Sequence, residues 1–150
     1  MKWFLALAFL SGTFLPIQVG ANATLRNYLG HAMQAALVSF AVGASAILLY
    51  CAIARIPLPK LTQLGEAPWW TWVGGLCGAF YIWMAIIVGP KVGAAALLAL
   101  VVAGQMVASL VLDHYALLGM PQNPATPLRL LGVGLVVVGV AVTVLTSKAT

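Results

Sequence analysis

The chain has 150 residues, of which 63% are hydrophobic and only 6% are charged, and its mean hydropathy is +1.09. A soluble domain carries about a quarter of its residues as Asp, Glu, Lys or Arg, so this composition excludes an ordinary water-soluble domain and predicts a lipid bilayer as the solvent. The formal net charge of +5 could suggest a nucleic-acid partner. The Lys and Arg residues are scattered singly, however, which favours anchoring at membrane interfaces and argues against nucleic acid.

Five hydrophobic runs are long enough to cross a membrane as helices, because a spanning helix needs about 20 apolar residues. In chain order they cover residues 3–20, 32–54, 70–88, 92–112 and 128–146. None alternates strictly between polar and apolar residues, as an outer-membrane strand would. The first run resembles a secretory signal peptide, but four further spans follow it, which favours a first transmembrane helix. The sequence therefore predicts an all-α integral membrane protein whose five transmembrane helices form a single domain, residues 1–150.

The connections between the runs predict where the helices begin and end. Gly89 and Pro90 predict a tight hairpin in which the glycine ends the third helix and the proline begins the fourth. Thr126 and Pro127 suit the N-cap and the first position of the fifth helix. The prolines of the segment 55–60 prevent the second helix from continuing.

The positive charges leave the orientation in the membrane open. With five spans, Lys2, Arg55, Lys60 and Arg129 lie on one side, and Arg26, Lys91 and Lys148 lie on the other. The bias is only 4 − 3 = 1, and Lys/Arg asymmetry is what orients a membrane protein, so two interpretations remain. Either the chain inserts in both orientations or another feature fixes its topology. Dual insertion is what an antiparallel pair would need, because inverted repeats require two oppositely facing halves.

Two polar stripes lie in or beside the predicted spans, each with residues four positions apart. They consist of Gln18, Asn22 and Arg26, and of Gln105, Ser109 and Asp113. The first set shares a helix face only if the first helix continues past Gly20. Polar groups inside a span cost on the order of 0.5 to 3 kcal/mol each unless they face protein or water, so both stripes are predicted to point inward.

The depths of the two stripes suggest a role between subunits. Within one protomer they lie in opposite halves of the membrane, whereas in two antiparallel protomers they lie at the same level. This predicts an inter-subunit charge pair between Arg26 and Asp113. The alternative is that both charges only anchor helix ends in water and head groups.

The amides are the candidate substrate contacts, because Gln18 and Gln105 lie well inside their spans. There an amide either joins helices or contacts a substrate. Pro16 frees a backbone carbonyl one turn earlier, and an interrupted helix beside polar side chains recurs at transporter sites. Tyr81 and Trp83, near the middle of the third span, either line a cavity and contact substrate or serve only in packing.

The remaining features predict a contact between subunits and give no sign of a metal site or of catalysis. Gly132 and Gly139 lie two turns apart on one face of the fifth span, which suits a dimer seam. The histidines and cysteines stand alone, so no metal site is predicted. No nucleophile with a base, no pair of carboxylates and no phosphate-binding glycine loop is present, so neither an enzyme activity nor a cofactor is predicted.

Four fragments resemble, in order, the YdcZ-like family of the drug/metabolite transporter superfamily. They are "PIQVGANATLR" at 16–26, "WVGGLCGAFYIW" at 72–83, "GQMVASLVLDHYALLG" at 104–119 and "PLRLLGVGLVVVGV" at 127–140. The resemblance implies a five-helix half of a ten-helix inverted-repeat transporter, assembled from two oppositely oriented halves. The candidate site residues that lie within the first and third fragments are Gln18, Asn22, Arg26, Gln105 and Asp113. The related small multidrug resistance proteins carry a membrane-buried Glu in helix one for proton-coupled cation export, and this chain lacks it.

Two functions follow as expectations. The first is a secondary transporter in the bacterial inner membrane, expected to export a small neutral or zwitterionic metabolite by alternating access. It would work as an antiparallel dual-topology homodimer or with an inverted paralogue. The second is a non-transporting membrane interaction or assembly protein, in which the amides only join helices.

Overall fold

The computed structural model describes residues 2–147 and is built from helices. The long helices are α1 (Lys2–Leu29), α2 (Ala32–Ile53), α4 (Val73–Val92), α5 (Ala94–His114) and α6 (Pro127–Thr146), and the short elements are α3 (Leu61–Glu66), η1 (Trp69–Trp72) and η2 (Leu117–Gly119). In the described residues, 5 helical segments are long and apolar enough to cross a membrane, with η1 and α4 forming one of them. The predicted all-α membrane class is confirmed. Lys148, which entered the charge count, lies outside the described residues.

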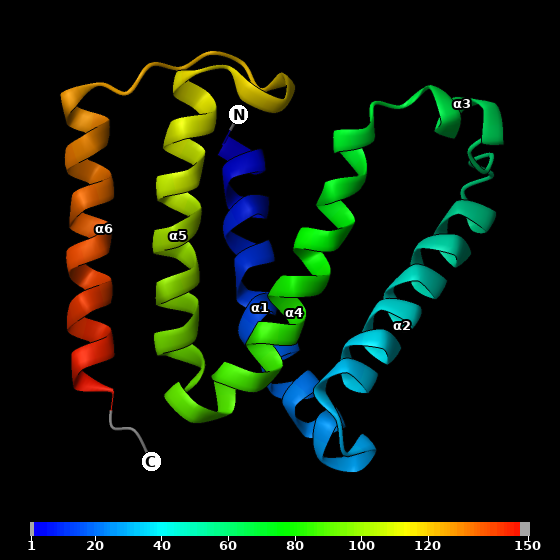
Figure 1. Cartoon of the computed structure of the whole chain (residues 1–150), viewed down its shortest axis with the longest axis horizontal. Coiled ribbons are helices and arrows are strands. Elements are labelled where there is room, and N and C mark those ends of the chain that lie inside the picture. Colours follow the sequence, from blue (N-terminus) through cyan, green and yellow to red (C-terminus); the bar gives the residue numbers. More distant parts are fainter. Residues whose placement is uncertain (1, 148–150) are drawn as a thin grey trace. The chain divides into compact units, whose positions relative to one another are not determined.

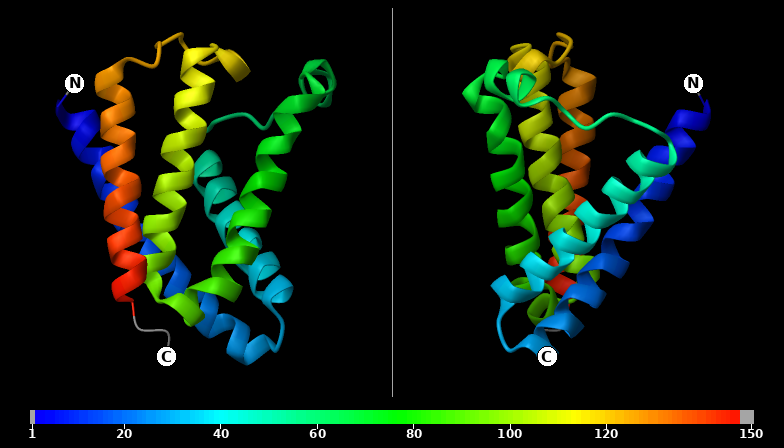
Figure 2. Two further views of the ribbon diagram at one scale, coloured as in Figure 1. Left: turned by 60° about the vertical axis from the view of Figure 1, so that its left-hand side comes forward. Right: turned by 90° about the vertical axis from the view of Figure 1, so that its right-hand side faces the viewer.

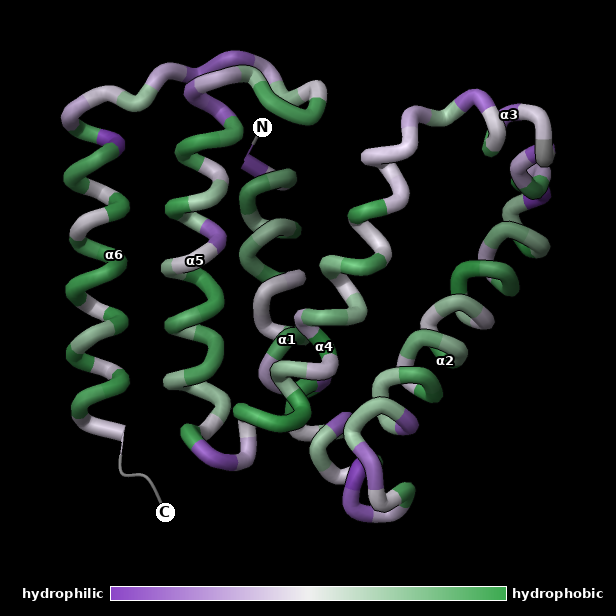
Figure 3. The backbone as a smooth tube through the Cα atoms, viewed as in Figure 1, coloured by the Kyte–Doolittle hydropathy of each residue, from purple (hydrophilic) through white to green (hydrophobic). Residues whose placement is uncertain are grey.

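The hydropathy of the backbone follows the helices closely. Hydrophobic residues run along α2, α4, α5 and α6, while hydrophilic residues gather at the helix ends and in the connections (Figure 3). This pattern is the one that a lipid solvent selects, because only a helix satisfies its backbone polar groups internally within the hydrocarbon region.

The helix boundaries meet one condition that the sequence left open and confirm one prediction. Helix α1 continues without a break past Gly20 to Leu29, with Pro16 inside it, so the first polar stripe does lie on one helical face. Thr126 caps α6: its hydroxyl oxygen accepts the backbone N–H of Arg129 at 3.3 Å, and Pro127 occupies the first turn.

The predicted hairpin is wrong in its position. Helix α4 continues through Gly89 and Pro90 and ends at Val92, and α5 begins at Ala94. The intervening Gly93 has φ +83°, and its N–H donates to the carbonyl of Gly89 at 2.9 Å. A positive φ is cheap only for glycine, so Gly93 makes the turn, whereas Pro90 is accommodated in the last turn of α4.

The chain divides into two compact units, which are described separately. Unit 1 combines the part of α1 up to Pro16 with the chain from Val88 onward, and unit 2 comprises Ile17–Ile87. The chain therefore passes from one unit to the other inside two helices, α1 and α4. The predicted single domain stays a prediction.

Unit 1 contains the antiparallel pair α5 and α6, which lie side by side (Figures 1 and 2). The residues between them, 115–126, include η2 and join the two helices at one end. At the opposite end, the hydroxyl of Ser147 donates to the carbonyl of Val92 at 2.8 Å. This bond ties the residue after α6 to the last residue of α4, two positions before α5 begins.

In unit 2, helices α2 and α4 converge near the start of α2 and diverge toward the connection that carries α3 (Figure 1). At the point of convergence Ala32, Ala35 and Ala36 pack against Ile82 and Ile86, and both Ala35 and Ile86 are 0% exposed. Small residues let two helix backbones approach closely, which explains why the core of this unit lies there.

Candidate functional site

The first polar stripe lies in unit 2 on one face of α1. Gln18 and Arg26 are half-buried, and Asn22 is 7% exposed. Asn22 is the one polar residue in the described chain that is buried. A buried amide costs free energy unless it finds a partner, so this position is the most constrained of the stripe.

Arg26 meets a carbonyl group that lacks its usual helical partner. Its Nη1 donates to the backbone oxygen of Ile86 on α4 at 3.5 Å, the long limit of a hydrogen bond. In a helix that oxygen would accept the N–H of the residue four positions later, which is Pro90 and has none. Arg26 therefore supplies a donor where the helix cannot. The predicted pair between Arg26 and the Asp113 of a second subunit stays a prediction.

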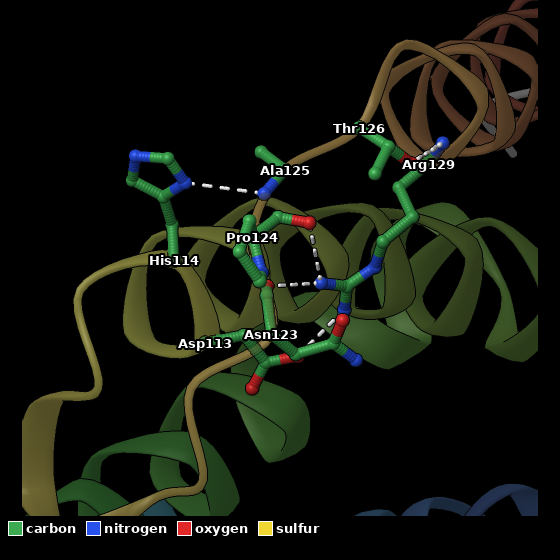
Figure 4. A network of polar contacts seen from close by, with 7 residues as sticks. All are labelled: Asp113, His114, Asn123, Pro124, Ala125, Thr126 and Arg129. Carbon is green, nitrogen blue, oxygen red and sulfur yellow. Dashed lines mark hydrogen bonds and ion pairs between the residues drawn. The ribbon is translucent and has the colours of Figure 1, made fainter.

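Asp113 has a partner within its own chain, at the end of unit 1 where α5 and α6 are joined (Figure 4). Its Oδ2 lies 2.6 Å from Nη2 of Arg129, and the two side chains are 23% and 33% exposed. Nη1 of Arg129 also donates to the backbone oxygens of Asn123, at 2.5 Å, and Pro124, at 3.4 Å. Charge-assisted contacts in a half-buried setting are stronger than neutral hydrogen bonds.

The connection between α5 and α6 also forms hydrogen bonds with the last two residues of α5, Asp113 and His114. The backbone N–H of Asn123 donates to the carbonyl of Asp113 at 2.8 Å, and the N–H of Ala125 donates to Nδ1 of His114 at 3.1 Å (Figure 4). The Gln122 amide donates to the carbonyl of His114 at 3.4 Å. Backbone groups that a helix end leaves unpaired are satisfied in this way.

Sequence reasoning missed the role of Arg129 and left His114 without one. The signal was present: Asp113 lies near the end of one span and Arg129 lies in the first turn of the next. Consecutive antiparallel helices place these two ends side by side, so opposite charges there should have been expected to pair.

One residue of the second polar stripe, Ser109, lines a small cavity between α5 and α6. The cavity has a volume of about 220 Å³ and is lined by Met106, Ser109, Leu110, Arg129, Gly132 and Val133. The structure thus brings Ser109 and Gly132 together with Arg129. Gln105, one turn from Ser109, is exposed and does not line the cavity. A role of Gly132 and the exposed Gly139 in a dimer seam stays a prediction.

Unit 2 contains a larger, apolar groove of about 600 Å³ between α2 and α4. It is lined by Met33, Ala36, Leu37, Phe40, Ala79, Phe80 and Trp83. Trp83 stands edge-on to Phe80, with ring centroids 6.2 Å apart. Tyr81 and Trp83 both pack against the unit's core, and the Tyr81 hydroxyl group is enclosed without a hydrogen-bond partner among the described residues. Contact of either ring with a substrate stays a prediction.

No metal-binding cluster is formed by residues 2–147, since three or more His, Cys, Asp or Glu side chains nowhere come together there. The two cysteines, Cys51 and Cys77, are free thiols.

These features define a multi-pass α-helical membrane protein with polar groups placed inside its spans. The model of a family described as "Putative inner membrane exporter, YdcZ" matches residues 3–142, and the chain belongs to this family. The chain is also 40% identical over 53 residues to the "Inner membrane protein YdcZ" of Escherichia coli (strain K12), a match that spans 35% of this chain and 36% of that relative. No solved structure matches the chain. The predicted family and the multi-pass inner-membrane location are confirmed, and the family is one of transporters rather than of enzymes.

Proposed function

We propose that the chain is one half of a secondary exporter for a small neutral or zwitterionic metabolite, which works by alternating access as an antiparallel dual-topology homodimer. The observation that carries this proposal is Asn22, an amide that is 7% exposed on the helical face it shares with Gln18. Polar groups inside a span are rare and mark substrate pathways by default. The membership in an exporter family gives these amides a transport context.

The charge of the substrate follows from the acidic residues, of which the chain has 2. Glu66 lies in the short helix α3, outside the long helices, and Asp113 is paired with Arg129 at 2.6 Å. A transporter of lipophilic cations would need a carboxylate that is available within its spans. An uncharged or zwitterionic substrate fits the amides better.

Alternating access needs elements that can bend, and prolines supply them in two helices. Pro16 lies where α1 passes from unit 1 to unit 2, and Pro90 lies in α4 three positions after Ile87, the last residue of unit 2. Kinks in helices occur mostly at proline, because the ring removes a backbone hydrogen bond. We assign these positions as the hinges of the transport cycle.

An antiparallel pair explains the near balance of Lys and Arg between the predicted sides. The bias that orients a membrane protein is almost absent, so the same chain can insert both ways and two copies can form an inverted repeat. An inverted paralogue could take the place of the second copy. The alternative function, a non-transporting assembly protein, requires neither insertion in both orientations nor flux of a substrate.

Transport is tested in inside-out membrane vesicles with a panel of radiolabelled neutral amino acids and sugars and with tetraphenylphosphonium as the lipophilic cation. We expect protein-dependent flux of a member of the neutral panel and none of the cation. Replacing Gln18 and Gln105 with Leu should abolish flux and spare dimerisation, whereas Gln34→Leu, at an exposed position of α2, should preserve both. Flux of the cation alone contradicts the proposal. Loosened dimers in a protein without any flux would instead support the assembly function.

A further inference from the structure

The cavity between α5 and α6 is lined by a positive charge and a hydroxyl group, and the proposed amide contacts do not account for this combination. Of its six lining residues, Arg129 carries a positive charge, Ser109 carries a hydroxyl group and none is acidic. We propose that this cavity binds the carboxylate of a small zwitterionic substrate through Arg129 and Ser109, and that Asp113 competes with that carboxylate for Arg129. This inference rests on the proposed transport function, and it narrows the substrate class to amino acids with short aliphatic side chains.

Arg129 has donors to spare for a ligand. A guanidinium group carries five N–H donors in a planar fork that matches a carboxylate. Within residues 2–147 its acceptors are Oδ2 of Asp113 and the backbone oxygens of Asn123 and Pro124. Two of the five donors are therefore uncommitted, and the side chain is 33% exposed where it lines the cavity.

Ser109 contributes a hydroxyl group that its own helix does not use. Most hydroxyl groups in the long helices donate to a carbonyl of the preceding turn, as Ser45 does to Ala41 at 2.8 Å and Thr143 does to Gly139 at 2.9 Å. In the described part of the chain, the Ser109 hydroxyl group makes no such bond. It lies one helical turn from Asp113, on the wall of the cavity that also holds Arg129.

The size and the remaining lining limit the ligand. A volume of about 220 Å³ is smaller than the roughly 300–1,000 Å³ of sites for drug-sized molecules. Met106, Leu110 and Val133 line the rest of the cavity, which suits an aliphatic side chain. A molecule such as alanine meets both conditions, whereas a large lipophilic cation meets neither.

Asp113 sets the strength of binding because it already neutralises Arg129 at 2.6 Å. A carboxylate that enters the cavity must share the guanidinium group with Asp113 and is repelled by its charge. Removing that charge while keeping a similar shape, as in Asp113→Asn, should therefore strengthen carboxylate binding. This outcome separates competition from a purely structural role, since loss of a structural ion pair would weaken binding.

Equilibrium binding of radiolabelled L-alanine to the full chain in lipid nanodiscs tests the proposal. Propionate, which has the carboxylate without the ammonium group, should displace alanine, and alanine methyl ester, which lacks the carboxylate, should not. Asp113→Asn should tighten binding several-fold. Arg129→Gln should weaken it by at least tenfold, and Ser109→Ala by about tenfold, the usual effect of losing one hydrogen bond to a charged group. Two control variants in the connection between α2 and α4, Arg55→Gln and Glu66→Gln, should bind as the native chain does.

Several results would overturn this assignment. They are unchanged binding in Arg129→Gln, weaker binding in Asp113→Asn, displacement by glycerol phosphate alone, which would indicate a lipid head-group site, or no saturable binding at millimolar alanine. If Arg129→Gln does not fold, Ser109→Ala and Asp113→Asn still decide the matter. Flux of a neutral panel member that survives Ser109→Ala and Arg129→Lys would refute this site and leave the proposed function standing. Binding without any flux would refute the proposed function and leave the site.

Discussion

Arg26 illustrates how a single residue can compensate for a proline. The Ile86 carbonyl has no helical donor because Pro90 lacks an N–H, and the Arg26 guanidinium lies 3.5 Å from that oxygen. A buried carbonyl without a partner costs about 1–3 kcal/mol in an apolar setting, so even a long charge-assisted contact has value there. Within one chain, Arg26 therefore connects α1 to α4 in unit 2 through this contact.

The contact predicts an energetic coupling between Arg26 and Pro90. Arg26→Met keeps the apolar stem of the side chain and removes the donor, and it should lower the free energy of unfolding by about 1–2 kcal/mol. In a Pro90→Ala background the new N–H can bond to Ile86, so the same substitution should cost markedly less. Denaturant unfolding in mixed micelles gives the four values of this double-mutant cycle. If the effects of Arg26→Met and Pro90→Ala on the free energy of unfolding are additive, the contact does not contribute to stability. Arg26 would then be available for a partner subunit.

At the scale of elements, the alanines at the start of α2 set its distance from α4. Ala35 is 0% exposed and packs in the cluster that contains Ile86, which is also 0% exposed. Ala35→Leu should therefore overpack the contact and lower stability by about 1–3 kcal/mol, measured by the same unfolding assay. Ala44→Leu makes the identical change on the exposed part of α2 and should have little effect. Equal effects of the two substitutions would show that the convergence of α2 and α4 does not stabilise unit 2.

The positions of the spans could be predicted from sequence because hydropathy and length decide them in a membrane. Two details could not. Helix α1 continues to Leu29 through polar residues that hydropathy alone would exclude, because a helix satisfies its backbone hydrogen bonds whatever the hydropathy of its side chains. The turn falls at Gly93 rather than at Pro90, because a positive φ demands glycine while a proline can lie in the last turn of a helix.

The sequence indicated some residues of the candidate site, whose role in binding stays a prediction, but it did not indicate the pairing of Asp113 with Arg129. Gln18, Asn22 and Ser109 were found because polar groups inside spans are conspicuous against an apolar background. The ion pair of Asp113 with Arg129 depends on how the connection 115–126 folds back to donate to the Asp113 carbonyl and to His114. Spacing within one helix carries no information about such a contact between helices.

For the whole molecule, the near balance of Lys and Arg is the feature on which the proposed antiparallel dimer depends. If neither orientation is preferred, a few added charges should decide it, because each Lys near the end of a span favours the orientation that keeps its loop in the cytoplasm. Two added lysines in the connection between α2 and α4, as in the pair Thr62→Lys and Gly65→Lys, should fix one orientation. The pair Asn27→Lys and Tyr28→Lys, at the end of α1, should fix the other. The four positions are exposed, so the substitutions should leave each unit's packing intact.

We expect a variant with either lysine pair to lose transport when it is expressed alone. We expect transport to return when the two variants are co-expressed. In a background with Cys51→Ser and Cys77→Ser, a Leu58→Cys reporter should react with a membrane-impermeant maleimide from both faces in the native chain. With either lysine pair it should react from one face. Flux should disappear when one biased variant is expressed alone and return when both are co-expressed, since only the mixture supplies opposed halves. Thr62→Gln with Gly65→Gln controls for the substitutions themselves. A native chain labelled from one face only, or a fixed variant that transports alone, contradicts dual topology while leaving the family membership intact.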